Sequence, residues 1–337
     1  MTDTPPLAVS LGDPAGIGPE LIAEAWARRE RCALPAFFLV GGEATLEQAA
    51  RSRGLSVPLV RIEAPEQALS AFSDALPVLA LNSGDHLALA GMPSREGAAL
   101  ALASLTTATR LTLSGQSSAI VTGPIAKSKL AEVGFRQPGQ TEFVADACGV
   151  AHDDAVMMLA GPNLRTVPLT VHIALRDVPA AITRDLIERR TRIIAKALAR
   201  DFGLSPARIA VTGLNPHAGE DGRMGREEID VIMPSIAALR AEGLSVSGPH
   251  PADALFAEHE RARFDVALCM YHDQALIPVK TLDFDQGVNV TLGLPIVRTS
   301  PDHGTAFGIA GKGIASPGAM IAAIRMAGEC AARRGRP

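Results

Sequence analysis

Residues 7–29 read LAVSLGDPAGIGPELIAEAWARR and decide the class of fold. An apolar run from Leu7 to Leu11 is followed by a glycine-rich turn. The amphipathic stretch Pro19–Arg29 comes next, and proline is well suited to the first turn of a helix. A strand, a tight turn and a helix in this order form the first part of a βα unit. The segment therefore predicts an α/β protein.

The same alternation continues along the chain. Further strands are predicted at Ala36–Val40, Val78–Leu81, Ala119–Thr122, Ala155–Leu159, Val167–Val171, Ile209–Thr212, Val266–Met270 and Val288–Leu292. Further helices are predicted at Arg95–Thr112, Thr183–Asp201, Glu227–Glu242 and Gly318–Arg333. Alternating elements favour a largely parallel sheet covered on both faces. A length of 337 residues fits two domains or one large α/β unit, and a cleft between two domains would be a natural ligand site.

Composition excludes several classes of protein. The 32 basic and 36 acidic residues are scattered along the chain, which argues against a nucleic-acid-binding surface. Apolar stretches such as Ala98–Leu105 are far shorter than the roughly 20 residues of a membrane span. Met1–Pro6 does not resemble a secretory signal, so we expect a cytoplasmic protein. The cysteines form no C-x-x-C pair and are predicted to be reduced core residues: Cys32, Cys148, Cys269 and Cys330.

Three polar segments adjoin predicted strand ends or helix starts. Backbone amides of the Gly12–Glu20 turn could face an anion, although a tight turn without a ligand explains the glycines equally well. Lys127 and Lys129 begin a helix, against the preference of the helix dipole, and this favours an anionic ligand. Thr141 could cap a helix running to Ala147, which is the simpler interpretation, or could bind a substrate.

Three of the eight histidines follow strand-like runs: His172, His217 and His272. The carboxyl ends of parallel strands gather ligand-binding groups, so these imidazoles could converge on one divalent metal. Their spacing matches no local metal motif, and a chance arrangement of core or loop histidines is the alternative. The other histidines with polar neighbours are predicted to be solvated: His86, His152 and His259.

Polar side chains are dense after His272. The hydrophobic runs Ala275–Val279 and Val288–Pro295 separate them, which is unusual for a solvated loop. We therefore expect buried strands that present polar ends to a site.

Seven blocks of this sequence closely resemble the PdxA family, the 4-hydroxythreonine-4-phosphate dehydrogenases of vitamin B6 biosynthesis. The blocks are GDPAGIGPE (12–20), TGPIAKSKL (122–130), GQTEFVAD (139–146), LNPHAGEDGRMGREE (214–228), GPHPAD (248–253), MYHDQALIPVK (270–280) and TSPDHGTAFGIAGKG (299–313). The last block also resembles the nucleotide loop of isocitrate and isopropylmalate dehydrogenases. This likeness implies their two-domain fold, with largely parallel sheets, an interdomain cleft and an NAD (or NADP) site without a Rossmann fingerprint. We accordingly expect an outer domain of residues 1–130 and 300–337, and a central domain of residues 131–299 with the metal ligands and a dimer interface.

The resemblance also implies roles for individual residues. The implied ligands of a divalent metal (Zn, Co or Mg) are His172, His217 and His272. The implied substrate-binding residues are Gln140, Thr141, Lys280, Asn289 and Arg298, with Asp253 and Asp273 at the metal centre. The implied cofactor-binding residues are His303, Gly304, Thr305 and Gly311. Gln140 stands where the family usually has His, and an amide keeps hydrogen-bonding capacity but cannot become cationic.

The implied reaction is oxidation of 4-phosphooxy-L-threonine to a β-keto acid, which decarboxylates to 3-amino-2-oxopropyl phosphate. Lys280 or Asp273 would accept the proton, and the sequence does not rank them. The family is dimeric, with a site built from both subunits.

Related dehydrogenases act on a phosphorylated tetronate or an aromatic cis-dihydrodiol, and these substrates are the nearest alternatives. A phosphate acyltransferase of the same general fold would need no metal. A non-catalytic metal-binding protein is disfavoured, because structural zinc sites usually have four ligands and the cysteine spacing offers no fourth.

Overall fold

The computed structural model describes residues 4–81 and 87–335. The chain forms two compact units, which we describe separately. The first unit comprises Met1–His152 and Leu294–Pro337, and the second comprises Asp153–Gly293. Residues 131–152, which the sequence-based division assigns to the central domain, belong to the first unit. The predicted α/β class is confirmed.

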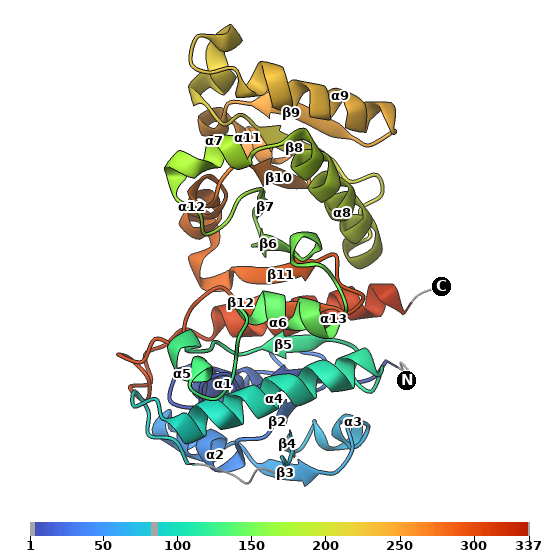
Figure 1. Cartoon of the computed structure of the whole chain (residues 1–337). Helices are drawn as coiled ribbons and strands as arrows, with labels where there is room; N and C mark the ends of the chain where they lie inside the picture. Colours follow the sequence, from blue (N-terminus) through green and yellow to red (C-terminus); the bar gives the residue numbers. More distant parts are fainter. Residues whose placement is uncertain (1–3, 82–86, 336–337) are drawn as a thin grey trace. The chain divides into compact units, whose positions relative to one another are not determined.

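The first unit contains six parallel strands in the order β3-β4-β2-β1-β5-β12. They are β1 (Leu7–Ser10), β2 (Phe37–Val40), β3 (Leu59–Ile62), β4 (Leu76–Leu79), β5 (Ile120–Thr122) and β12 (Arg298–Pro301). The helices are α1 (Gly18–Ala27), α2 (Glu43–Ser52), α3 (Gln67–Ala71), α4 (Arg95–Leu113), α5 (Lys127–Ala131), α6 (Gln140–Ala147) and α13 (Gly318–Arg334). Figure 1 shows α4 lying across the strands of this unit, and its apolar side buries Leu100, Ala101 and Leu105.

The turn after β1 explains why the opening segment is rich in glycine. Gly12 has φ +72°, and a Cβ atom there would lie 2.5 Å from the carbonyl oxygen of Pro124. The backbone amide of Asp13 donates to that same oxygen at 2.8 Å. Only glycine permits this approach, which holds the end of β1 against the segment that follows β5.

The second unit has the strand order β11-β6-β7-β10-β8-β9. These strands are β6 (Val156–Ala160), β7 (Arg165–Pro168), β8 (Ile209–Thr212), β9 (Val246–His250), β10 (Val266–Cys269) and β11 (Val288–Leu292). The helices are α7 (Val178–Ala181), α8 (Arg184–Phe202), α9 (Met233–Ala241), α10 (Ala252–Leu255), α11 (Glu258–Arg261) and α12 (His272–Asp283). The β11–β6 and β6–β7 pairs are antiparallel and the remaining pairs are parallel.

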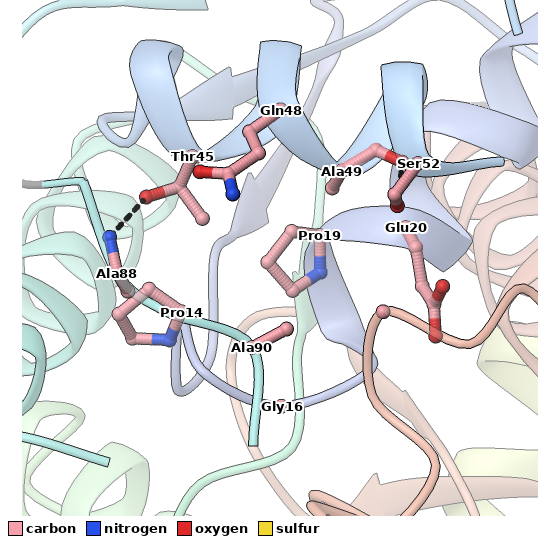
Figure 2. A pocket seen from close by; sticks show the side chains of 11 residues that line it. Pro14, Gly16, Pro19, Glu20, Thr45, Gln48, Ala49, Ser52, Ala88 and Ala90 are labelled. Carbon is pink, nitrogen blue, oxygen red and sulfur yellow. Dashed lines mark hydrogen bonds between the residues drawn. The ribbon is translucent and has the colours of Figure 1, made fainter. Parts of the chain in front are cut away.

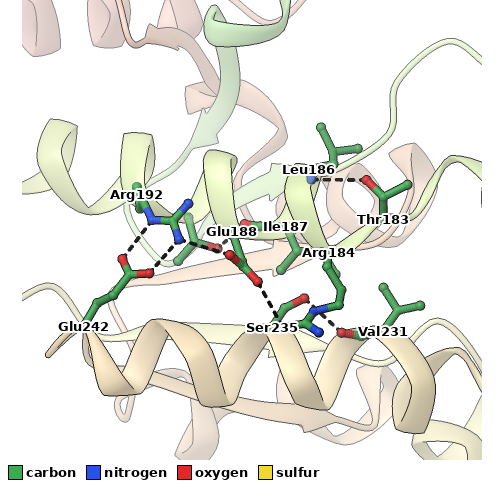
Figure 3. A network of polar contacts seen from close by, with 10 residues as sticks. Thr183, Arg184, Leu186, Ile187, Glu188, Arg192, Val231, Ser235 and Glu242 are labelled. Carbon is green, nitrogen blue, oxygen red and sulfur yellow. Dashed lines mark hydrogen bonds and ion pairs between the residues drawn. The ribbon is translucent and has the colours of Figure 1, made fainter.

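A polar network joins α8 to the end of α9 (Figure 3). Arg192 donates to both carboxylate oxygens of Glu242, at 2.8 and 2.6 Å, and to Glu188 at 3.0 Å. Thr183 caps α8 by accepting a hydrogen bond from the Leu186 amide. The Arg192 pairs are exposed, so each contributes little to the stability of the fold.

Two sequence-based interpretations are wrong. Ala275–Val279, expected as a buried strand, lies inside α12. Its buried residues Ala275, Leu276 and Val279 share one helix face, and Pro278 within the helix obscured that spacing. The cysteines are free, but only Cys269 and Cys330 are buried, whereas Cys32 and Cys148 are partly exposed.

Within residues 4–81 and 87–335, no helix has the length and apolar character needed to cross a membrane.

Candidate functional site

Three of the predicted substrate-binding residues meet in the first unit. Arg298, the first residue of β12, donates through Nη2 to the Thr122 hydroxyl at 2.8 Å, and its Nη1 lies 3.4 Å from the Thr141 hydroxyl. Gln140 donates through Nε2 to the Gly123 carbonyl at 3.1 Å. These residues, Gln140, Thr141 and Arg298 with Thr122 and Gly123, form what we call the Arg298 cluster. The structure thus joins residues 157 positions apart in the sequence.

The electrostatics of this cluster favour an anion. Arg298 is buried, and burial lowers the pKa of its guanidinium to about 10, although nearby Glu142 opposes this fall. A buried cation is costly unless a negative charge neutralises it. An anionic ligand group beside Arg298 would form charge-assisted hydrogen bonds with the guanidinium.

The hydroxyl of Thr141 is directed to this cluster and does not cap a helix. Helix α6 begins at Gln140 with Gly139 as its N-cap residue. The capping interpretation of Thr141 is therefore wrong, because the helix begins two residues earlier than capping by Thr141 would require.

The predicted cofactor loop contacts the opening glycine-rich turn. The Ile17 amide donates to the Thr305 carbonyl at 3.0 Å. A Cβ atom on Gly16 would lie 2.9 Å from that same oxygen, so the two segments approach closely only because residue 16 is glycine. His303 donates within its own loop, from Nδ1 to the Gly304 carbonyl at 3.0 Å. The turn supports the loop, a relation that the sequence did not reveal.

A cavity lies beside this contact (Figure 2). Gly311 of the predicted cofactor loop and Gly16 of the turn line it, together with side chains of α2. Its polar lining includes Thr45, Gln48 and Ser52, and Thr45 accepts a hydrogen bond from the Ala88 amide. The cavity combines an apolar wall with hydroxyl and amide groups, the mixture typical of small-molecule sites.

A buried ionic cluster supports the loop next to the cavity. Arg53 Nη1 lies 3.5 Å from Glu20 Oε2, Arg53 also pairs with Glu24, and its Nη2 donates to the Ala315 carbonyl at 3.1 Å. Burial raises the pKa of Glu20, while Arg53 and the Gly311 amide act in the opposite direction. These charges tie α1 and α2 to the segment that follows Gly311.

Two of the predicted metal ligands lie together in the second unit. The ring centroids of His172 and His272 are 5.8 Å apart, and both side chains line one pocket with Asp273 and Tyr271. Asp273 Oδ1 lies 2.7 Å from His272 Nδ1. A carboxylate on one ring nitrogen orients an imidazole and leaves the other nitrogen for a metal. The pair therefore fits a divalent ion that prefers imidazole ligands.

His217 lies on the loop that follows β8 and is exposed. In the described part of the chain, no group of three His, Cys, Asp or Glu side chains is placed to hold a metal ion. His217 is thus not gathered with the other two histidines within this single chain, and its role stays a prediction.

The remaining predicted residues are distributed over the second unit. Lys280 lies on α12, two turns after His272, and Asp253 is exposed on α10. Asn289 lies on β11, and its Oδ1 atom is buried without a hydrogen-bond partner among the described residues, as expected for a ligand-binding amide. His152 and His259 have exposed side chains, as predicted, and His86 lies outside the described residues.

Sequence reasoning missed two supporting side chains of this unit. Gln274 accepts hydrogen bonds from Thr212 Oγ1 and the Met270 amide at 2.7 Å and donates to the Gly213 carbonyl at 2.9 Å. Glu228 accepts hydrogen bonds from the loop that carries His217. Both lie inside the quoted blocks, but no local pattern distinguishes them from their polar neighbours.

Comparison with known proteins gives a consistent result. The model of the family described as "Pyridoxal phosphate biosynthetic protein PdxA" matches residues 33–327. A 4-hydroxythreonine-4-phosphate dehydrogenase of Erythrobacter litoralis is 62% identical over 98% of this chain and 97% of that protein.

Solved structures are similar over almost the full length. A 4-hydroxythreonine-4-phosphate dehydrogenase of Klebsiella pneumoniae has a TM-score of 0.84 and 35% identity, covering 98% of this chain and 99% of that one. A terephthalate 1,2-cis-dihydrodiol dehydrogenase of Burkholderia xenovorans has a TM-score of 0.65 and 28% identity, covering 96% of this chain and 98% of that one.

Proposed function

Because the chain belongs to the PdxA family, we propose that it is an NAD- and divalent-metal-dependent dehydrogenase of 4-phosphooxy-L-threonine in pyridoxal phosphate biosynthesis. The observation that carries the choice of substrate is the Arg298 cluster. A buried guanidinium beside the hydroxyls of Thr122 and Thr141 is suited to a phosphate or carboxylate. Lys280 and the buried Asn289 oxygen would bind further polar groups of the substrate.

The proposed reaction has two steps. The substrate carbon that bears the hydroxyl gives up a hydride and the hydroxyl gives up a proton, which produces a β-keto acid. The bond to the carboxylate then breaks, carbon dioxide leaves, and the remaining carbon takes up a proton. The chemistry that a divalent ion would supply, held by the histidines, is a lower pKa of the substrate hydroxyl, and a nicotinamide cofactor would supply the hydride acceptor.

Residues of this chain would bind the metal ion and the cofactor and transfer the proton. Asp273 contacts His272, so we assign it to orienting that imidazole and assign proton transfer to Lys280. His172 and His272 would hold the ion, with His217 of the same or a second copy as the third ligand. The loop from His303 to Gly311 would bind the cofactor, and the cavity beside Gly311 supports this assignment.

We also propose a homodimer. Ile173 and Leu175, which line the histidine pocket, are 44% and 68% exposed. Large apolar side chains beside a polar site are typical of a surface that another protein covers. A second copy of this chain would cover them and could bring its own His217 to the pocket.

One alternative substrate is specifically favoured by an observation. Gln140 replaces the family's usual histidine, and a 28% identical solved relative is titled a cis-dihydrodiol dehydrogenase. An amide can bind a hydroxyl of an uncharged diol as well as a phosphate.

Substrate-panel kinetics test the proposal. NAD reduction would be followed with 4-phosphooxy-L-threonine, a phosphorylated tetronate and an aromatic cis-dihydrodiol, each with and without a chelator. We expect reduction with the first substrate and its loss on chelation. Reduction with the diol alone would favour the alternative, and chelator-resistant activity would exclude the metal-dependent mechanism.

A further inference from the structure

The loop that carries His217 has an unusual backbone. Five consecutive residues, His217 to Asp221, have φ between +42° and +81°. Only Gly219 among them lacks a Cβ atom, and left-handed conformations are unfavourable for the other four. Such a turn persists only when surrounding groups hold it.

Glu228 binds the segment that leads into this turn. Its Oε1 atom accepts hydrogen bonds from the backbone amides of Leu214 and Asn215, both at 2.8 Å. Its Oε2 atom accepts a third from Asn215 Nδ2 at 3.0 Å. The side chain is only 2% exposed, although it carries a carboxylate.

The start of the loop and the centre of the left-handed turn pack against this carboxylate. A Cβ atom on Gly219 would lie 2.6 Å from Glu228 Oε2, and one on Gly213 would lie 3.1 Å from Oε1. Glu228 begins a helical turn at Glu228–Ile232 that continues into α9, so its own backbone is anchored. The carboxylate therefore fills the interior of the loop from a fixed element.

We infer that Glu228 is a positioning residue, which fixes the left-handed turn and so the direction in which His217 presents its imidazole to the metal. The inference rests on the proposed function, because it takes His217 as a metal ligand. Without the carboxylate, the two amides lose their acceptor and the turn can relax toward right-handed conformations. His217 would then sample orientations that do not bind the ion.

Cobalt binding tests this inference without an activity assay. Metal-free full-length protein would be titrated with Co²⁺, and visible absorption would report both affinity and ligand geometry. We expect Glu228→Met, which keeps the length of the side chain but removes both acceptor oxygens, to weaken Co²⁺ binding about 10- to 100-fold, the usual effect of removing a group that orients a metal ligand. Glu227→Met is the matched control. The Glu227 carboxylate accepts a hydrogen bond from the Asn215 side chain at 2.7 Å and none from the Leu214 and Asn215 amides, so its loss should change affinity less than about threefold.

A second pair of variants separates positioning from general damage. Ala218 has φ +52°, so Ala218→Gly makes the left-handed turn more accessible. Added to Glu228→Met, it should restore part of the Co²⁺ affinity. If Glu228→Met does not fold, Asn215→Ala removes one of the three donors and should give a smaller loss, about three- to tenfold.

The outcomes distinguish the inference from the proposed function. Wild-type Co²⁺ affinity in both Glu228→Met and Asn215→Ala, with affinity lost in His217→Ala, would overturn the role of Glu228 and leave the metal site intact. Equal affinity in wild type and His217→Ala would overturn the proposed ligand and the inference together. A loss in Glu228→Met that Ala218→Gly partly reverses supports the positioning role of Glu228.

Discussion

Replacing Arg298 by methionine tests the anion site most sharply. Burial lowers the pKa of Arg298 to about 10, so at about 1.4 kcal/mol per pKa unit the protein interior opposes this charge by an energy on the order of a few kcal/mol. A substrate anion would neutralise the guanidinium and recover much of that energy. Arg298→Met keeps the volume but not the charge, so kcat/KM should fall about 100-fold.

Arg298→Met should also have a defined effect on the stability of the protein. Removing a buried charge of this kind should leave the free energy of unfolding in urea unchanged or slightly higher. Arg190 of α8 is the control, because burial also lowers its pKa although no substrate role is predicted for it. Arg190→Met should keep the wild-type KM. Wild-type kcat/KM in Arg298→Met would refute the assignment of Arg298 to the substrate.

Three further perturbations have defined outcomes. Gly293→Ala should lower the free energy of unfolding by about 3 kcal/mol or more. Residue 293 has φ +85°, and the new Cβ atom would lie 2.0 Å from the Asp154 carbonyl oxygen. An unchanged urea midpoint would contradict this prediction. Burial of Asp265 raises the pKa of its carboxyl group. The hydrogen bonds and charge of Arg208 together lower this pKa by more than burial raises it, so the net pKa is below its ordinary value. This stabilisation should be complete above about pH 4 and fade as pH falls through the lowered pKa, and Asp265→Asn should flatten that dependence in acid unfolding curves. Leu175→Asp should shift the proposed dimer toward monomer in sedimentation velocity, and an unaffected dimer would exclude Leu175 from the interface.

Regular periodicity explains which elements were predictable. The helix predicted at Thr183–Asp201 is observed at Arg184–Phe202, where a threonine cap and a left-handed Gly203 mark its ends. Strand β9 was missed because its sequence, VSGPH, contains glycine and proline. Strand β3 was missed because three of its four residues are not buried, so it has no continuous apolar run. Local sequence does not encode such tertiary context.

The candidate site was predictable only where residue type and position coincide. Strand-end position identified His172 and His272, which do lie together. It placed His217 in the same set, although the loop after β8 carries that residue into an exposed left-handed turn. Glu228 could not be distinguished from Glu227, because adjacent glutamates differ here only in burial and in the amides that reach them.

Product stoichiometry tests the proposed reaction most directly. Metal-loaded protein would be given 4-phosphooxy-L-threonine labelled in its carboxylate carbon, with NAD in excess, and NADH and released carbon dioxide would be measured in the same reaction. The proposed oxidation and decarboxylation predict one carbon dioxide for each NADH, and neither product after chelation. NADH without carbon dioxide, or no NADH from this substrate, would contradict the proposed function.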